Sequence, residues 1–345
     1  MENLKKLSES RGISGFEYRI TDCIKTMFEA YSDTVYVDTL GNLIAVKKSE
    51  NENAKKVMIE AHLDEIGLMV KSISENGFIT FVNIGGVDER ILPSMEVTVH
   101  GKKDIKGIIG AKPPHLIIGA DSEKAYKIKD LAIDTGLTFD EVSSLVSVGD
   151  SITLNSGFVT LLNEIYSGKS LDDRAGVFAI LEVFKALKDT KLDVDLYGVM
   201  AVCEEVGGRG AMVLGNAINP DIAIAIDVTH GITPDNSKGA FELSSGVAIS
   251  VGPNIHPKLS KKLISLAKDN EIKHSIEVEG GDTGTDAWLL QVAGDGIPTA
   301  LLSFPLRYMH TTVETISKED IESLVNLLKI FARNLDGDME DWLCY

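Results

Sequence analysis

The sequence predicts an α/β fold in which a sheet lies between two layers of helices and a small β-rich unit is inserted into the chain. Segments with helical spacing alternate with short apolar runs at both ends of the 345 residues. Glycine-rich, strand-like runs fill the middle. Alternating helical and strand patterns are typical of a sheet covered by helices, and the length allows one large or two ordinary domains.

The segments before and within the insertion differ in residue composition and in the spacing of their apolar residues. Residues 17–31 repeat apolar positions at helical spacing, and the short apolar run 57–62 (VMIEAH) predicts a buried strand. Residues 67–162 instead carry short runs of Gly, Val and Ile broken by turn signals such as ENG, GG and HGKKD. This pattern predicts a small barrel-like unit. Because α/β patterning flanks it on both sides, we expect residues 1–66 and 163–345 to form one domain.

Strand and helix patterns alternate again after the insertion. Four apolar runs predict strands, at 194–203, 221–228, 247–251 and 297–304. Three segments with helical spacing accompany them, at 174–188, 257–270 and 318–335. The second part of the chain therefore supplies most of the predicted sheet.

The charge balance argues against nucleic acid and anionic membranes as partners. Acidic residues outnumber Lys and Arg by 52 to 34, giving a net charge of −18, whereas such partners require clustered Lys and Arg. No run approaches the roughly 20 apolar residues that cross a bilayer, and the N-terminus lacks the apolar core of a signal peptide. The three cysteines are widely spaced, which disfavours a disulfide framework. We therefore expect a cytoplasmic protein.

The first candidate for metal binding is His62, which ends the predicted strand 57–62. Side chains two residues apart in an extended segment point the same way. Asp64 could therefore accept a hydrogen bond from one ring nitrogen while the other nitrogen binds a metal. The alternative is a buried structural histidine beside an acid, and the pair alone leaves these two interpretations balanced.

Two pairs of adjacent acids lie at the start of a predicted helix and at the end of a predicted strand. Asp172 and Asp173 precede a helix, where acids usually act as caps; alternatively, one of them bridges two metal ions. Glu204 and Glu205 end an apolar run. Paired glutamates are usually a solvated face, but neighbouring strand residues point to opposite sides, so one could bind metal while the other acts as a general base.

Three further candidates follow predicted strands. Asp227 ends the run DIAIAID, and burying an acid without a partner is costly, so a metal ion or a helix cap must satisfy it. His230 is a lesser candidate because it lies in a turn of unknown direction. His310 closes the segment PLRYMH after the last predicted strand; taken alone, such a histidine is more often structural.

Together these residues favour a hydrolytic metal site. Ligands collect beyond the carboxyl ends of strands in α/β sheets, and carboxylates with imidazoles suit zinc, cobalt or manganese. Cys203 is interpreted as a core residue rather than a ligand. A Ser-His-Asp triad would require the elbow GxSxG, which is missing from the sequence, as is a P-loop.

The motifs HLDEIGLMV, LDDRAG, EEVGGRGA, GTDAW and PLRYMHTTVE, with the Asp after AIAI, resemble those of the glutamyl- and deblocking-aminopeptidase family. These dinuclear metallopeptidases include the TET aminopeptidases. The motifs occur in the family's order and, counted from GISGFE near the N-terminus, span about residues 12–314. The resemblance implies a three-layer α/β/α metallopeptidase domain that removes N-terminal residues from peptides.

The resemblance also implies ligand roles. His62 and Asp227 would bind one divalent metal ion, Glu205 and His310 would bind the other, and Asp172 would bridge both. Zinc and cobalt are the metals that it favours.

The resemblance also implies roles for two residues that do not bind metal, and it implies how the subunits assemble. By resemblance, Glu204 is the general base that activates water, and Asp64 orients the imidazole of His62. The inserted β-rich unit would mediate dimerisation, and six dimers would assemble into a tetrahedral dodecamer. Peptides are the expected partners, and the preferred N-terminal residue is left open.

The nearest alternative is an endoglucanase-type glycoside hydrolase, because some relatives carry that name and paired carboxylates hydrolyse glycosides. Sugar-binding clefts favour exposed aromatic residues, however, and this chain is only 6% aromatic. His62 and His310 would also lack a role. A non-catalytic assembly protein of the same fold would be expected to lose Glu204 or a ligand, and all are present.

Overall fold

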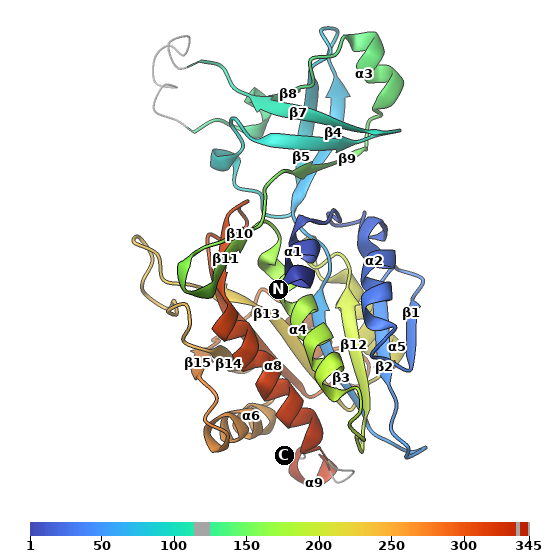
Figure 1. Cartoon of the computed structure of the whole chain (residues 1–345), viewed down its shortest axis with the longest axis vertical. Helices are drawn as coiled ribbons and strands as arrows, with labels where there is room; N and C mark the ends of the chain where they lie inside the picture. Colours follow the sequence, from blue (N-terminus) through green and yellow to red (C-terminus); the bar gives the residue numbers. More distant parts are fainter. Residues whose placement is uncertain (114–124, 336–338, 344–345) are drawn as a thin grey trace.

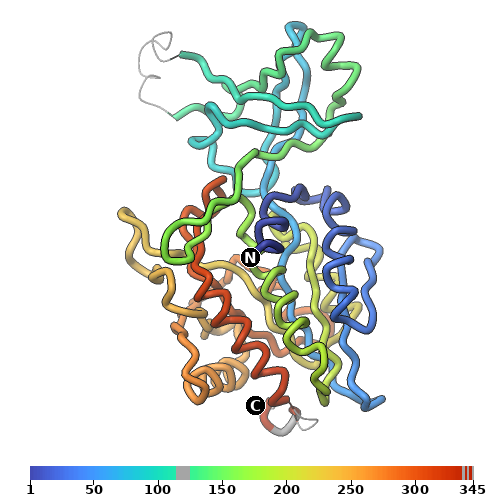
Figure 2. The backbone as a smooth tube through the Cα atoms, viewed as in Figure 1, coloured from blue at the N-terminus to red at the C-terminus, as the bar shows by residue number. Residues whose placement is uncertain are grey.

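The computed structural model describes residues 1–113, 125–335 and 339–343. Figure 1 shows two parts, a barrel above and a larger sheet covered by helices below. Both ends of the chain belong to the larger part, as Figure 2 shows. The barrel is therefore an insertion between segments of one larger unit.

The larger part is built on an 11-stranded sheet. Nine strands follow one another in the order β1 (Thr34–Val37), β2 (Leu43–Lys47), β12 (Asp195–Ala201), β3 (Lys56–His62), β13 (Ile222–His230), β16 (Thr299–Arg307), β17 (Glu314–Ser317), β11 (Ile165–Gly168) and β10 (Val159–Thr160). The other two are β14 (Val247–Val251), which pairs with β16, and β15 (His274–Val278), which pairs with β14. The four central strands β12, β3, β13 and β16 are parallel. Their carboxyl ends consequently meet at one edge of the sheet.

Helices cover both faces of this sheet. One face carries α1 (Glu2–Glu9), α2 (Tyr18–Phe28), α4 (Leu171–Leu187), α6 (Pro257–Asp269), α8 (Lys318–Arg333) and α9 (Met339–Leu343). The other face carries α5 (Arg209–Ile218) and α7 (Ala287–Leu290). In the part of the chain that the structure describes, no helix combines the length and the apolar character needed to cross a membrane.

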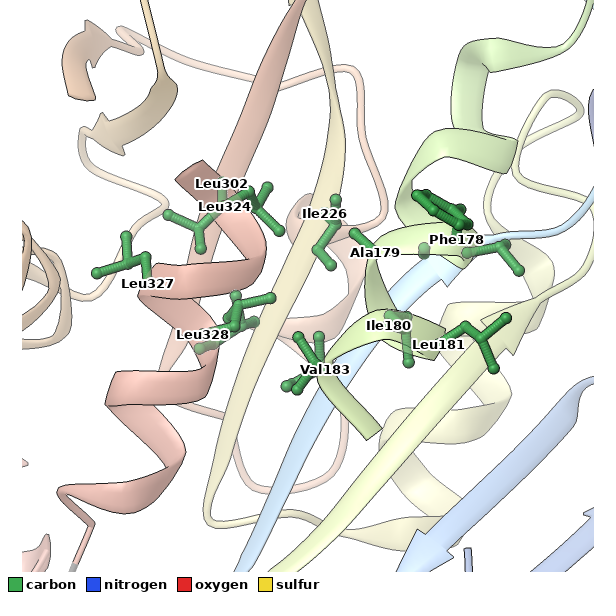
Figure 3. Packing of buried hydrophobic residues seen from close by; sticks show 14 of the residues in the cluster. Phe178, Ala179, Ile180, Leu181, Val183, Ile226, Leu302, Leu324, Leu327 and Leu328 are labelled. Carbon is green, nitrogen blue, oxygen red and sulfur yellow. The ribbon is translucent and has the colours of Figure 1, made fainter. Parts of the chain in front are cut away.

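Strand β13 shows why the sheet must lie between two helical layers. Its isoleucines at 222, 224 and 226 belong to the core beneath α4 and α8, whereas Ala223 and Ala225 belong to the core beneath α5 and α7. Successive strand residues point to opposite faces, so a strand that is apolar throughout requires cover on both sides. In Figure 3 Ile226 lies between Ala179 of α4 and Leu324 of α8.

The barrel is closed by six strands. They are β4 (Gly67–Ile73), β5 (Ile79–Ile84), β8 (Ala132–Asp134), β7 (Asp104–Gly110), β6 (Glu96–His100) and β9 (Ser151–Leu154). Within its described residues, the barrel also carries the short helices η1 (Glu89–Ile91), η4 (Ile128–Asp130) and α3 (Phe139–Leu145), and η5 (Leu162–Glu164) follows β10 in the larger part. A separate apolar core fills the barrel.

These observations confirm the predicted α/β fold with a barrel-like insertion. The domain limits at residues 66/67 and 162/163 stay a prediction. The barrel strands lie between Gly67 and Leu154, and β10 pairs with β11 of the large sheet. Residues 114–124 of the predicted insertion lie outside the described residues.

Candidate metal centre

The candidate side chains meet at the carboxyl edge of the four parallel strands. His62 ends β3, Asp227 lies near the end of β13, and His310 follows β16. Glu205 lies in the turn after β12, which runs parallel to β3. Strands far apart in the sequence thus place their polar ends together because the sheet aligns them.

Asp172 lies between the two histidines and offers one oxygen to each. Its Oδ1 is 3.0 Å from Nε2 of His62, and its Oδ2 is 3.5 Å from Nε2 of His310. The hydrogen bonds from His310 and His62 outweigh burial and hold the pKa of Asp172 well below its usual range. Burial alone would lower the pKa of His62, but its bonds to Asp172 and Asp64 raise it well above its usual range.

The two adjacent aspartates divide their contacts. Oδ1 of Asp173 accepts a hydrogen bond from the backbone N–H of Gly176 at 3.0 Å, as a residue capping a helix does. Asp172 has non-helical backbone angles, and its side chain instead meets the histidines. This arrangement agrees with the prediction that one acid of the pair serves the helix while its neighbour faces the metal centre.

Glu204 and Glu205 line the same cavity as Asp172 and His310. Strand β12 ends at Ala201, so the expectation that alternation along a strand separates the two glutamates is wrong; both belong to a turn. Burial raises the pKa of Glu204 to about 8 and that of Glu205 to about 7, and nearby carboxylates including Asp172 add to both shifts.

Asp64 connects His62 to this turn. Its carboxylate is 3.6 Å from Nδ1 of His62 and accepts hydrogen bonds from the backbone N–H groups of Glu204 at 3.0 Å and Glu205 at 3.2 Å. Ser14 donates a further bond at 2.6 Å. Asp64 is fully buried, and its backbone carbonyl oxygen lies 3.2 Å from Nδ1 of His62, so its carbonyl faces the imidazole and its carboxylate binds the glutamate turn.

Asp227 completes the group of candidate ligands. It is buried, and it lines the same cavity of about 610 Å³ as Asp172 and Glu205. Burial raises the pKa of Asp227 well above its usual range, and the neighbouring Asp172 adds to the shift. His230 is exposed but also borders this cavity.

The donor set fits divalent metal ions. Within the described residues, ligand atoms of His62, Asp172 and Glu205 lie within 4.8 Å of one another. His310 extends this group, since its Nε2 is 3.4 Å from Oε1 of Glu205. Imidazoles and carboxylates without a thiolate are the donors of hydrolytic zinc, cobalt or manganese sites. Cys203 lies at the edge of the main core, and its Sγ is 3.5 Å from the Glu17 carboxylate.

Glu314 was assigned no role from the sequence, although it closes the motif PLRYMHTTVE. Its carboxylate accepts hydrogen bonds from the backbone N–H of Asp172 at 3.1 Å and from that of His310 at 3.0 Å. Burial raises the pKa of Glu314 well above its usual range. The signal in the sequence that could have identified Glu314 was an acid four residues after the candidate ligand His310. Glu314 therefore joins the loop of Asp172 to the turn of His310.

Gly86 was also missed, because the pair GG at 85–86 was interpreted only as a turn signal. The carbonyl oxygen of Gly86, between β5 and η1, is 3.1 Å from Nδ1 of His310. A proton on Nδ1 leaves Nε2 free to face Asp172 and Glu205. A Cβ atom at Gly86 would lie 2.6 Å from Nδ1 of His310. The inserted unit thus contacts a candidate ligand directly.

Comparison with known proteins identifies the family of this chain. The sequence matches the M42 glutamyl aminopeptidase family over residues 41–327. It is 36% identical over 342 residues to lysyl aminopeptidase of Pyrococcus furiosus, and the aligned residues cover 97% of each chain.

Solved structures share the fold over almost the entire chain. A TET aminopeptidase from a marine sediment Thaumarchaeota archaeon superposes with a TM-score of 0.93 at 30% identity, covering 99% of this chain and 98% of the other. The TET1 peptidase of Pyrococcus horikoshii, described as assembling into a tetrahedron or a large octahedral shell, gives 0.85 at 35% identity over 97% and 99%. A Thermotoga maritima protein named an endoglucanase gives 0.78 at 31% over 96% of each chain. This chain belongs to the M42 glutamyl aminopeptidase family and is a metal-dependent aminopeptidase.

Proposed function

We propose that this protein removes N-terminal residues from peptides with two divalent metal ions per subunit, zinc or cobalt, and with Glu204 as the general base. The observation that carries this proposal is the placement of Asp172, whose two oxygens each face a different histidine. A carboxylate in that position suits a bridge between two ions. His62 and Asp227 would then bind one ion, and Glu205 and His310 the other.

The chain's own residues have complementary tasks in the reaction. When bound, the metal ions supply a Lewis acid that polarises the scissile carbonyl and lowers the pKa of the attacking water. Glu204 takes the proton from that water and returns it to the leaving amine. Its position favours this task, because it lines the same cavity as Asp172 and Glu205. The carboxylate of Asp64 holds Glu204 in place by accepting a hydrogen bond from the Glu204 backbone N–H, and Asp64 orients His62.

The lining of the cavity favours a peptide over a sugar chain as substrate. Among the described residues that border it, none is Phe, Tyr or Trp, whereas sugar-binding clefts commonly stack rings on aromatic side chains. A glycoside hydrolase would also leave His62 and His310 without a task. These features support the peptidase over the endoglucanase alternative.

We also propose that the protein acts in the cytoplasm as a homo-oligomer. The barrel would join two subunits, and six such dimers would form a tetrahedral dodecamer. Support comes from the 35% identity to the TET1 peptidase of Pyrococcus horikoshii. The acidic surface, with its net charge of −18, supports a partner other than nucleic acid or membrane.

Glu204→Gln tests the assignment of the base. Gln keeps the shape of the side chain but cannot take a proton, so we expect kcat on aminoacyl-p-nitroanilides to fall by about a hundredfold to ten-thousandfold. Metal content, measured by elemental analysis, should stay at two ions per chain. Glu52→Gln, on an exposed loop, is the matched control and should retain full activity. Equal activity in the two variants would refute the assignment.

A further inference from the structure

The cavity beside the metal centre has a second wall that the proposed chemistry does not use. Besides the candidate catalytic residues, it is bordered by the end of β13, by β15 and by the loop 283–285. The cavity of about 610 Å³ is continuous from Glu204 to this wall. A peptide whose first bond reaches Glu204 must therefore place its first side chain against one of these surfaces.

Two carboxylates, Glu277 and Glu279, form what we call the acidic wall. Both residues border the cavity, and their spacing of two along an extended segment places them on the same side. Glu277 is held in position, because its carboxylate accepts hydrogen bonds from the hydroxyls of Thr229 and Ser250. The register of β14 against β15 pairs Ser250 with Glu277, so the sheet itself places this carboxylate.

His230, which also borders the cavity, opposes the charge of Glu277 in part. None of the described residues bordering the cavity is a Lys or an Arg. Burial raises the pKa of Glu277, and repulsion from Glu279 adds to the shift. The carboxylates at the candidate metal centre would be balanced by bound ions, whereas the acidic wall meets no permanent positive charge among the described residues that border the cavity. A cation bound between Glu277 and Glu279 would relieve their repulsion.

The same cavity also offers apolar surface. Leu301 and Met309 border it, and Leu301 is almost fully buried at 2% exposure. Lys and Arg side chains combine an aliphatic stem with a charged head, and they bind best where apolar and acidic surfaces occur together.

We propose that this wall binds the first side chain of the substrate and selects peptides that begin with Lys or Arg. The inference rests on the proposed aminopeptidase function and names the substrate class of that site. Acidic N-terminal residues would be disfavoured, because their carboxylates would meet Glu277 and Glu279 with no cation between them.

A substrate panel tests this inference with the metal-loaded protein. We would measure kcat/KM on lysyl-, arginyl-, leucyl- and glutamyl-p-nitroanilide, and expect lysyl and arginyl substrates to exceed leucyl by at least about tenfold, with glutamyl lowest. Glu277→Gln and Glu279→Gln should each lower the lysyl-to-leucyl ratio several-fold. Glu279→Lys should raise glutamyl hydrolysis relative to lysyl. Glu52→Gln changes an exposed glutamate that does not border the cavity, and it should leave every ratio as it is.

Calorimetric titration with L-lysine and L-leucine, the corresponding products, separates this inference from the proposed function. The titration measures binding of the amino acid in the pocket whether or not the protein hydrolyses a substrate. Loss of hydrolysis for all four substrates would refute the proposed function, and tighter binding of lysine would still support the acidic wall. Equal binding of the two amino acids, or ratios unaffected by Glu277→Gln and Glu279→Gln, would overturn it. A uniform rise of KM for all substrates in these two variants would also overturn it. Both carboxylates would then bind the α-amine, which every substrate shares, rather than the first side chain.

Discussion

His310 and Glu205 hold protons in the metal-free protein that a divalent ion must displace. The hydrogen bond with Asp172 raises the pKa of His310 to about 9, and burial raises that of Glu205 to about 7. A histidine binds metal only when neutral and a glutamate only when ionised. Raising the pH removes both protons, so metal affinity should rise with pH. We expect about tenfold per pH unit for each proton displaced, hence a steeper rise below pH 7, where both protons are displaced, than between pH 7 and pH 9.

Competition against a chelating indicator, corrected for the indicator's own protonation, measures this dependence. Calorimetry in buffers of different ionisation enthalpy counts the protons released. Glu205→Gln removes one titrating group, so its proton release below pH 7 should be smaller than that of the unaltered protein. An affinity that is constant between pH 6 and pH 8 would contradict the prediction.

Sequence reasoning succeeded for residues that follow recognisable strands and failed for those whose role depends on contacts between distant segments. The structure brings His62, Asp172, Glu205 and His310 together as predicted. Their roles as metal ligands remain predictions. Glu314 could not be assigned because its partners are backbone groups 142 and 4 residues away.

At the scale of the element, the longer buried strands and the longer amphipathic helices were the predictable ones, whereas the five-residue buried strand β2 was not predicted. The apolar runs 221–228 and 247–251 correspond to β13 and β14, and the helical pattern 318–335 to α8. Strand β1 was missed because it lies at the sheet edge and is mostly exposed, so no apolar alternation marks it. Burial produces the sequence pattern that such reasoning detects, and exposed edge strands lack it.

The loop between β5 and η1 joins the barrel to the metal centre, and Gly86→Ala tests this connection. Gly86 does not have a positive φ, so alanine suits its backbone. The added Cβ would lie 2.6 Å from Nδ1 and 2.9 Å from Cε1 of His310, so the imidazole must move and loses its bond to the Gly86 carbonyl. We expect the metal content to fall from two ions towards one per chain, as measured by elemental analysis.

Gly157→Ala is the matched control for this substitution. A Cβ at Gly157 would meet no atom within 4 Å, and its φ is likewise not positive. This variant should retain the full metal content. Equal metal content in both alanine variants would show that the loop does not position His310.

At the scale of the whole molecule, the barrel exposes aromatic side chains that a single subunit leaves uncovered. Phe78 and Phe139 are 43% and 42% exposed. The turn before Phe78 packs against the start of α3, since a Cβ at Gly77 would lie 3.1 Å from the Phe139 nitrogen. Exposed apolar groups that lie together commonly mark a contact between proteins. They are therefore candidates for the proposed dimer contact.

Phe78→Asp combined with Phe139→Asp tests that contact. Burial of the exposed parts of these two phenylalanine side chains contributes roughly 1 to 3 kcal/mol, and two added carboxylates oppose burial further. Light scattering after size exclusion should give the unaltered protein a mass near twelve times the 37.3 kDa chain and shift the variant towards a single chain. Tyr18→Asp replaces an exposed aromatic of α2 and should leave the dimer intact. An unchanged mass, with the thermal unfolding temperature preserved, would place the subunit contact elsewhere on the molecule.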